Sequence, residues 1–125
     1  MTETIDTILI RLIENIIING HEHILANFRD KEKIFEYMRT KQQPALIEIE
    51  KVCRIRLSKI KGNQKTLFIK IIEQVAAYKG IVDLILKDQE KYLLINRVIE
   101  NMNDAYEKLK DSIKEYKSAK YSTAV

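Results

Sequence analysis

Residues 67–116 read LFIKIIEQVAAYKGIVDLILKDQEKYLLINRVIENMNDAYEKLKDSIKEY, and this stretch decides the fold. Its apolar residues recur at alternating steps of four and three positions, a heptad pattern typical of helices that pack along a seam. Only Gln74 and Asp88 interrupt the seam, and its register passes unchanged through Gly80. We therefore expect one continuous helix over residues 64–117, about 80 Å long at ~1.5 Å per residue. The seam positions are Leu67, Ile71, Gln74, Tyr78, Ile81, Ile85, Asp88, Tyr92, Ile95, Ile99, Met102, Tyr106, Leu109, Ile113 and Tyr116.

A second helical face precedes this stretch. Apolar residues from Ile5 to Met38 recur at helical spacing, and the phase of the face survives across Asn19-Gly20, a common turn or helix-end signal. We favour one long helix over about residues 3–39, with a bend at Gly20 if it bends at all. The alternative is two helices joined at Asn19-Gly20.

The segment from Thr40 to Pro44 is predicted to connect this helix to a second one over about residues 44–61, because proline suits the first helical position. Gly62-Asn63 then supplies a stop and a cap. The predicted fold is all-α, a single domain over residues 1–125 built as an antiparallel bundle of three long helices. Residues 118–125 lack periodicity and are expected to form a flexible tail.

The composition agrees with few, long elements. Hydrophobic residues make up 46% of the chain, which is enough for a real core, and three glycines and one proline leave few breakers. The formal net charge of +4 arises from 22 basic and 18 acidic residues, so opposite charges largely cancel. A surplus this small indicates little about partners.

Several features predict a cytoplasmic protein without membrane insertion. Cys53 is the only cysteine, so no disulfide can form within the chain, which suits a reducing compartment. Glu3 and Asp6 stand where a signal peptide would carry positive charge. The most apolar run, Ile8 to Ile18, contains Arg11 and Glu14 and is too short to cross a bilayer.

The sequence offers no catalytic or metal-binding pattern. His21 and His23 flank Glu22, but residues two apart point to opposite sides of a helix, so we expect two surface histidines that share no metal. Cys53 falls on the apolar face of the second helix and is expected to be a small buried hydrophobe rather than a nucleophile. Phosphate-binding glycine loops are absent. We therefore predict no enzyme activity, no cofactor and no metal.

One stretch of the sequence is strongly basic. Between residues 51 and 70 no acidic residue occurs, and the run straddles the turn between the second and third predicted helices. It would suit a nucleic acid or an acidic protein surface. The alternative is a solvated turn whose charges are balanced by acids nearby in space. The basic residues are Lys51, Arg54, Arg56, Lys59, Lys61, Lys65 and Lys70.

The C-terminal part of the seam is narrow, since nearly all residues around it are charged or amides. The first predicted helix spans about 54 Å at ~1.5 Å per residue, so part of the third helix should project beyond the bundle. A projecting apolar stripe implies a protein partner or self-association, although the first helix could instead cover it. The stripe consists of Ile99, Met102, Tyr106, Leu109, Ile113 and Tyr116.

The order of short motifs along the chain resembles one protein family. A long first helix leads into Lys41-Gln42-Gln43, and the second helix carries Leu46-Ile47-Glu48-Ile49 with Arg54 or Arg56 near its end. Ile81-Val82-Asp83-Leu84-Ile85 and Tyr92-Leu93-Leu94 follow, then Asn96, Asn101, Asn103 and a late Tyr121. In this order and length the chain resembles the FlgN-type flagellar export chaperones. It departs from their pattern in having Lys91 and Tyr92 before Leu93-Leu94, where the family has an asparagine, and in lacking a glycine after Tyr121.

The resemblance implies a small cytoplasmic helical protein that holds a hook–filament junction subunit before export. It also implies a client-binding surface on the C-terminal part of the last helix, with Tyr106, Leu109, Ile113 and Tyr116 as anchors. The first hypothesis is thus a protein-binding chaperone or adaptor. Two alternatives stay open: a small basic subunit of a nucleic-acid-associated assembly, and a coiled-coil structural protein that associates with itself.

Overall fold

The computed structural model describes residues 5–27, 29–87 and 95–122, and all regular secondary structure in these residues is helical. The all-α prediction is therefore confirmed. Two of the helical segments contain a π-helical turn, labelled η, between two α-helical parts. The elements are α1 (Ile5–Ile13), η1 (Glu14–Asn19), α2 (Gly20–Ala26), α3 (Lys31–Tyr37), η2 (Met38–Gln42), α4 (Gln43–Leu57), α5 (Asn63–Lys87) and α6 (Ile95–Ser122).

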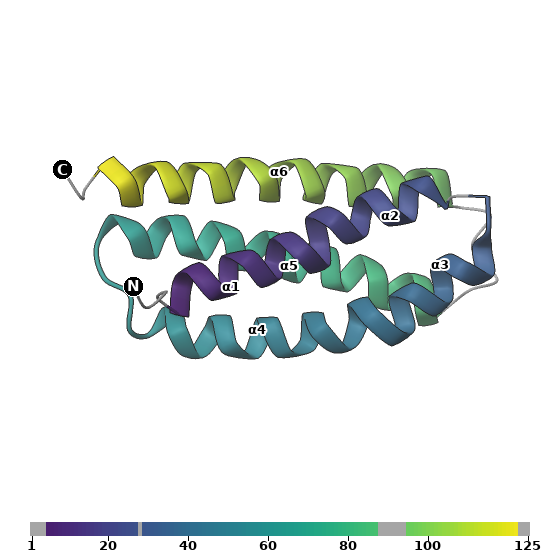
Figure 1. The fold of residues 1–125 in the computed structure, drawn as a ribbon, viewed down its shortest axis with the longest axis horizontal. Coiled ribbons are helices and arrows are strands. Elements are labelled where there is room, and N and C mark those ends of the chain that lie inside the picture. Colours follow the sequence, from purple (N-terminus) through teal and green to yellow (C-terminus); the bar gives the residue numbers. More distant parts are fainter. Residues whose placement is uncertain (1–4, 28, 88–94, 123–125) are drawn as a thin grey trace.

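The elements form four long helical segments that run alternately in opposite directions (Figure 1). The segment from α1 to α2 is followed by the segment from α3 to α4, and then by α5 and α6. Packing joins α1 to α4, α4 to α5, α5 to α6 and α6 back to η1, so the four segments close a bundle. The described connection between α4 and α5, residues 58–62, is short, as in bundles whose neighbouring helices are antiparallel.

The predicted continuous helix over residues 64–117 is wrong, because α5 and α6 lie side by side and antiparallel (Figure 1). The ring of Phe68 near the start of α5 lies 5.9 Å from that of Tyr116 near the end of α6. Lys70 Nζ likewise lies 3.8 Å from Glu115 Oε1. The seam residues Asp88 and Tyr92 lie outside the described residues.

The heptad register did not reveal this reversal because of the spacing between the two helices. Ile85, the last seam residue of α5, and Ile99, on α6, stand two heptads apart in the sequence. Each helix of an antiparallel hairpin has its own heptad face, and a separation of whole heptads leaves the two faces in the same phase. The three-helix prediction therefore becomes a four-helix structure, and α6 continues to Ser122 where a flexible tail was expected from residue 118.

The first break in the chain is also displaced from its predicted place. The helix passes through Gly20 and ends at Ala26, with the side chain of Asn27 donating to the carbonyl of His23 at 2.8 Å. Asp30 then caps α3 by accepting a hydrogen bond from the backbone N–H of Lys33 at 3.1 Å. The predictions of a helix over residues 3–39, and of a break at Asn19-Gly20, are both wrong.

The predicted connection from Thr40 to Pro44 is helical, since η2 and α4 run through it without interruption. Proline lacks an N–H and its ring crowds the carbonyl four residues earlier, which usually breaks or kinks a helix. Here the chain widens into the π-helix Met38–Gln42 just before Pro44, and a wider turn accommodates the ring. The second predicted helix, 44–61, thus begins earlier, at Lys31, and its α-helical part ends at Leu57.

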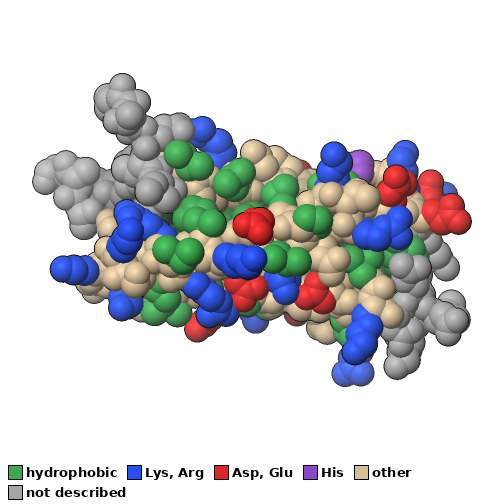
Figure 2. Space-filling view, turned by 90° about the horizontal axis from the view of Figure 1, so that it is seen from below, with side chains coloured by type: hydrophobic (Ala, Val, Ile, Leu, Met, Phe, Trp, Pro, Cys, Tyr) green, Lys and Arg blue, Asp and Glu red, His purple; other side chains and the backbone are tan. Residues whose placement is uncertain are grey.

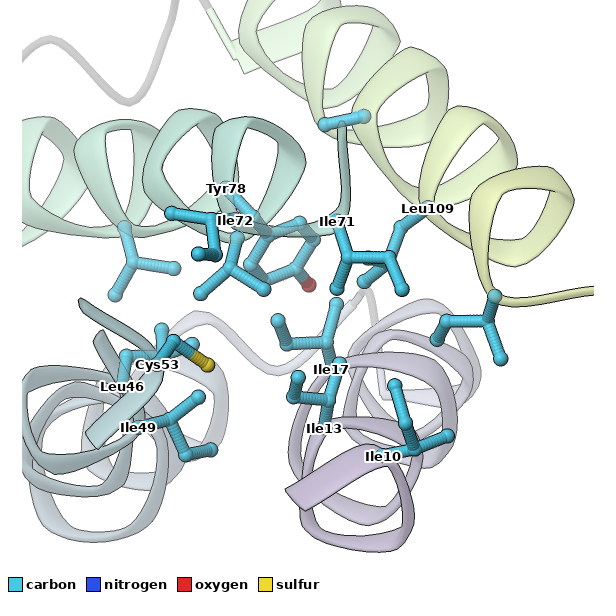
Figure 3. Close-up of a cluster of buried hydrophobic side chains, with 14 of the residues drawn as sticks. Ile10, Ile13, Ile17, Leu46, Ile49, Cys53, Ile71, Ile72, Tyr78 and Leu109 are labelled. Atoms are coloured by element: carbon cyan, nitrogen blue, oxygen red, sulfur yellow. The ribbon is translucent and has the colours of Figure 1, made fainter. Parts of the chain in front are cut away.

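One hydrophobic core draws on all four segments (Figure 3). Isoleucines of α1 and η1 face α4, α5 and α6 across the bundle axis, and Cys53 lies among them with no exposed surface. The prediction that Cys53 is a small buried hydrophobe is confirmed. Core residues labelled in Figure 3 are Ile10, Ile13, Ile17, Leu46, Ile49, Cys53, Ile71, Ile72, Tyr78 and Leu109.

Candidate functional site

The predicted C-terminal stripe lies inside the bundle. Met102, Leu109 and Tyr116 have at most 2% of their surface exposed, and only Ile99 among the six residues is half-buried. Packing of α6 against α5 as well as η1 covers the stripe, whereas the alternative drawn from the sequence was cover by the first predicted helix. The expectation that it projects from the bundle is therefore wrong, because all of its residues except the half-buried Ile99 are buried.

The predicted basic run splits into paired and unpaired charges. Lys51 and Arg54 form ion pairs with Glu48 and Glu50 on the same helix, at 3.7 Å and 2.9 Å, and Lys70 pairs with Glu115 on α6. Arg56 is half-buried. The remaining three are exposed at the turn between α4 and α5 and make no ion pair with any residue that the structure describes: Lys59, Lys61 and Lys65.

A buried polar cluster that the sequence did not predict surrounds His21. This side chain has no exposed surface, so the expectation of a surface histidine is wrong for His21. Its Nε2 lies 2.6 Å from Asn103 Oδ1, and its Nδ1 lies 3.0 Å from the hydroxyl of Tyr78. Its ring stacks on Tyr106 with the centroids 4.5 Å apart. The cluster therefore joins α2, α5 and α6.

The partners of His21 select one tautomer of its neutral ring. A carbonyl oxygen only accepts, so Nε2 carries the proton that it donates to Asn103, and Nδ1 accepts from the Tyr78 hydroxyl. Burial lowers the pKa of His21 below its ordinary value of 6.5, although Asn103, Glu107 and Glu22 oppose that shift. The neutral ring is thus fully hydrogen-bonded. Because His21 has no exposed surface, a solute could reach its ring only if the bundle opened.

The two π-helical turns meet beside this cluster. Gln42, at the end of η2, is buried and donates from its Nε2 to the carbonyl of Ile16 in η1 at 3.1 Å. A Cβ added to Gly20 would lie 2.8 Å from this Nε2 and 3.0 Å from the hydroxyl of Tyr37. A side chain at position 20 would therefore require Gln42 or Tyr37 to shift, so this glycine permits a close approach inside a helix and does not form a turn.

A surface groove lies between α1 and α4. It has a volume of about 260 Å³, and all but one of the residues that line it are apolar: Ile8, Leu9, Leu12, Glu48, Ile49 and Val52. Of the seven large hydrophobic side chains that are exposed in the described part of the chain, five belong to these two helices: Ile8, Leu12, Ile47, Val52 and Ile55. Ile55 follows Val52 by one helical turn and is 65% exposed.

Figure 2 shows the face of the molecule on which α4 lies. Hydrophobic side chains gather on this face in several places, with Lys and Arg side chains between and beside them. Contiguous exposed apolar side chains on a protein surface are typical of sites that bind another molecule. The sequence carried a signal of this surface, because the apolar face of the first helix is wider than one buried stripe needs, and Ile8 and Leu12 stand at its edge.

Across residues 5–27, 29–87 and 95–122, no three His, Cys, Asp or Glu side chains come close enough together to bind an ion. Within those residues, too, no helix has a stretch long and apolar enough to cross a membrane. Comparison with family models, with curated proteins and with solved structures gave no match to this chain.

Proposed function

We propose that this chain is a non-enzymatic protein-binding protein, an adaptor or chaperone, that receives a partner in the groove between α1 and α4. The observation that supports this proposal is the grouping of Ile8, Leu12, Val52 and Ile55 on one face. Fully burying one aliphatic side chain contributes about 1.5–3 kcal/mol, so covering these partly exposed ones is a substantial driving force.

The shape of the groove favours a helix as the binding element. Its two walls are antiparallel helices, and a third helix can lay its apolar side between them as a further member of the bundle. Leu9 and Ile49 form the floor and are already buried in the core, so the floor is rigid. Binding would therefore need little rearrangement of the chain.

The resemblance to the FlgN-type export chaperones suggests one class of partner, an export client met in the cytoplasm. The client-binding surface that this resemblance implies, however, would fall on the α6 stripe. The side chains of that stripe are buried and hold α6 against α5. We therefore assign binding to the α1–α4 groove and keep the export client as the partner class that the resemblance proposes.

The test is site-specific photocrosslinking in the source cells followed by binding to the purified partner. A photoreactive residue at Ile55, beside the groove, should capture a protein that the same residue at Leu84, exposed on α5, does not capture. The captured protein is then purified and titrated calorimetrically against the whole chain. Leu12→Ser with Val52→Ser should weaken binding by at least ~10-fold, or about 1.4 kcal/mol.

The matched control is Leu25→Ser with Leu84→Ser, which removes two similarly exposed leucines outside the groove. It should leave the affinity unchanged. Equal losses from the two double variants, or no loss from either, would show that the groove is not the binding surface. Far-ultraviolet circular dichroism of the native chain and the two double variants checks that each variant keeps its helices.

A further inference from the structure

The groove does not end at its apolar walls, since one stripe of α4 extends from it to the basic turn. Glu48 and Val52 line the groove, and Ile55 and Lys59 follow at steps of three and four residues. Beyond Leu57 the chain keeps coiling, because the N–H of Lys59 donates to the carbonyl of Arg56 at 2.9 Å. The N–H of Ile60 donates in the same way to Leu57 at 3.3 Å. Lys59 therefore stands close to the line of the groove.

The charges along this stripe are unevenly distributed. At the groove, Lys51 is offset by Glu48, which lies 3.7 Å away. At the turn, Lys59, Lys61 and Lys65 are exposed without an acidic partner among the described residues. The N-terminus of α5 at Asn63 adds partial positive charge to the same place. The stripe thus carries Glu48, paired with Lys51, at the groove, apolar side chains at Val52 and Ile55, and exposed lysines at the turn.

We propose that the occupant of the groove is an amphipathic helix of another protein that carries acidic residues at one end. Its apolar side lies on Ile8, Leu12, Val52 and Ile55, and its acidic end lies over the turn between α4 and α5. This inference rests on the proposed function and adds to it the chemistry and the direction of the partner. Opposite charge at one end fixes the register of the helix and speeds its capture.

Other occupants match fewer of these features. A second copy of this chain has a net charge of +4 and so offers a poor counterpart to the basic turn. A nucleic acid would match the three lysines and leave the apolar groove unused. An anionic membrane takes up apolar side chains that protrude, whereas Ile8, Leu12 and Val52 line a concave groove.

The experiment uses synthetic helical peptides that share one apolar face and differ at one end. Glutamates occupy the first turns of one peptide and the last turns of another, and matched peptides carry lysine or glutamine instead. Fluorescence anisotropy against the whole chain should show one glutamate peptide binding at least ~10-fold more tightly than its lysine counterpart at low salt. The preference should shrink as salt is added, because the lysines are exposed.

Two triple variants separate the charge at the turn from the overall charge. Lys59→Gln, Lys61→Gln and Lys65→Gln should remove the preference for glutamate while keeping the affinity for the glutamine peptide. The control, Lys33→Gln, Lys87→Gln and Lys108→Gln, makes the same change in net charge at exposed sites elsewhere and should keep the preference. Equal loss in both triple variants would overturn the proposal.

Four other results of these experiments would each lead to a different conclusion. Equal binding of all peptides, lost in Leu12→Ser with Val52→Ser, would overturn the acidic partner and leave the groove as a binding site. Failure of every peptide to bind would overturn the helix-binding groove itself. Concentration-dependent dimers in sedimentation would point to a second copy. Binding of duplex DNA, or of phosphatidylcholine–phosphatidylserine vesicles, that exceeds peptide binding would assign the lysines to those ligands instead.

Discussion

The Nε2 atom of His21 lies 2.6 Å from Oδ1 of Asn103, a hydrogen bond between residues 82 positions apart in the chain. It joins the first and last helical segments in the interior of the bundle. A second bond, from the Tyr78 hydroxyl to Nδ1, ties the same ring to α5. Buried polar groups joined in this way fix the register of helices, because a slip would leave them unpaired in the core.

This arrangement predicts that stability falls as the solution becomes acidic. Burial lowers the pKa of His21 in the folded chain, so the unfolded chain binds the proton more readily. The contribution of neutral His21 is complete above its ordinary pKa of 6.5 and is lost as the pH falls from there through the lower, folded-state pKa. Urea denaturation at a series of pH values between 8 and 5 (roughly the range in which histidine titrates) measures the slope.

Two variants identify the group responsible for that slope. His21→Gln removes the imidazole, so its stability should depend less on pH over the same range. His23→Gln changes the exposed histidine two residues along and should keep the slope of the native chain. A native slope in His21→Gln would assign the pH dependence to other groups.

The part of the fold that could be predicted is the part that depends on periodicity. Apolar residues at helical spacing predicted the all-α class and the burial of Cys53. The reversal between α5 and α6 could not be predicted from the same pattern, because Ile85 and Ile99 stand a whole number of heptads apart. Periodicity indicates which side of a helix is buried but does not indicate in which direction the helix runs.

Local breaker signals misled for a different reason. Pro44 and Gly20 are strong turn signals, yet a π-helical turn precedes each of them and the helix continues. Gly20 is required by the Gln42 side chain packed against it, a tertiary contact that the neighbouring sequence does not contain. The break that the structure does show lies before α3. Its signal in the sequence is the capping residue Asp30, and such a signal is short and common. The candidate groove was missed because exposure depends on which helices become neighbours.

Glycine substitutions should separate these roles. Gly80 lies inside α5 with no atom of the described residues within 4 Å of an added Cβ, so Gly80→Ala should stabilise the chain by about 0.5–1 kcal/mol through helix propensity. Gly20→Ala gains the same propensity but forces Gln42 Nε2 away from the Ile16 carbonyl. We expect it to be less stable than Gly80→Ala by about 1–3 kcal/mol, the cost of a lost buried hydrogen bond. Thermal and urea denaturation of both variants make the comparison.

Gly62 provides a third arm of that series. Its φ is 73°, a left-handed conformation that costs a residue with a Cβ about 1–2 kcal/mol. In the part of the chain that the structure describes, nothing lies within 4 Å of an added Cβ, so a loss in Gly62→Ala is expected to arise from the backbone. Gly62→Asn should recover part of the loss, because asparagine tolerates this conformation better. Equal stability of Gly62→Ala and the native chain would contradict the assigned backbone conformation.

The thiol of Cys53 should be inert in the folded chain. Burial, helped by the charge of Glu50, raises its pKa to about 11, so the reactive thiolate is scarce at neutral pH. The side chain also has no exposed surface. Reaction with Ellman's reagent should therefore be slow without denaturant and rapid in urea. Fast labelling of the native chain would show that α4 opens readily from the core.

Truncating a side chain of the predicted α6 stripe should destabilise the chain, whereas truncating one beside the α1–α4 groove should leave its stability nearly unchanged. Leu109, in the stripe, has no exposed surface and packs in the core, so Leu109→Ala should lower the free energy of unfolding by about 2–5 kcal/mol. Ile55, beside the groove, is 65% exposed, so Ile55→Ala should change it by less than about 0.5 kcal/mol.

Urea denaturation followed by circular dichroism measures both changes. If α6 presented its stripe to a partner, Leu109→Ala would instead leave the isolated chain nearly as stable as before. Domain stabilities are commonly about 5–15 kcal/mol, so the loss at Leu109 is large enough to be measured without ambiguity. Because Leu109→Ala acts on the core and Ile55→Ala on the surface, weaker partner binding in Ile55→Ala with unchanged stability would locate the binding surface on α4.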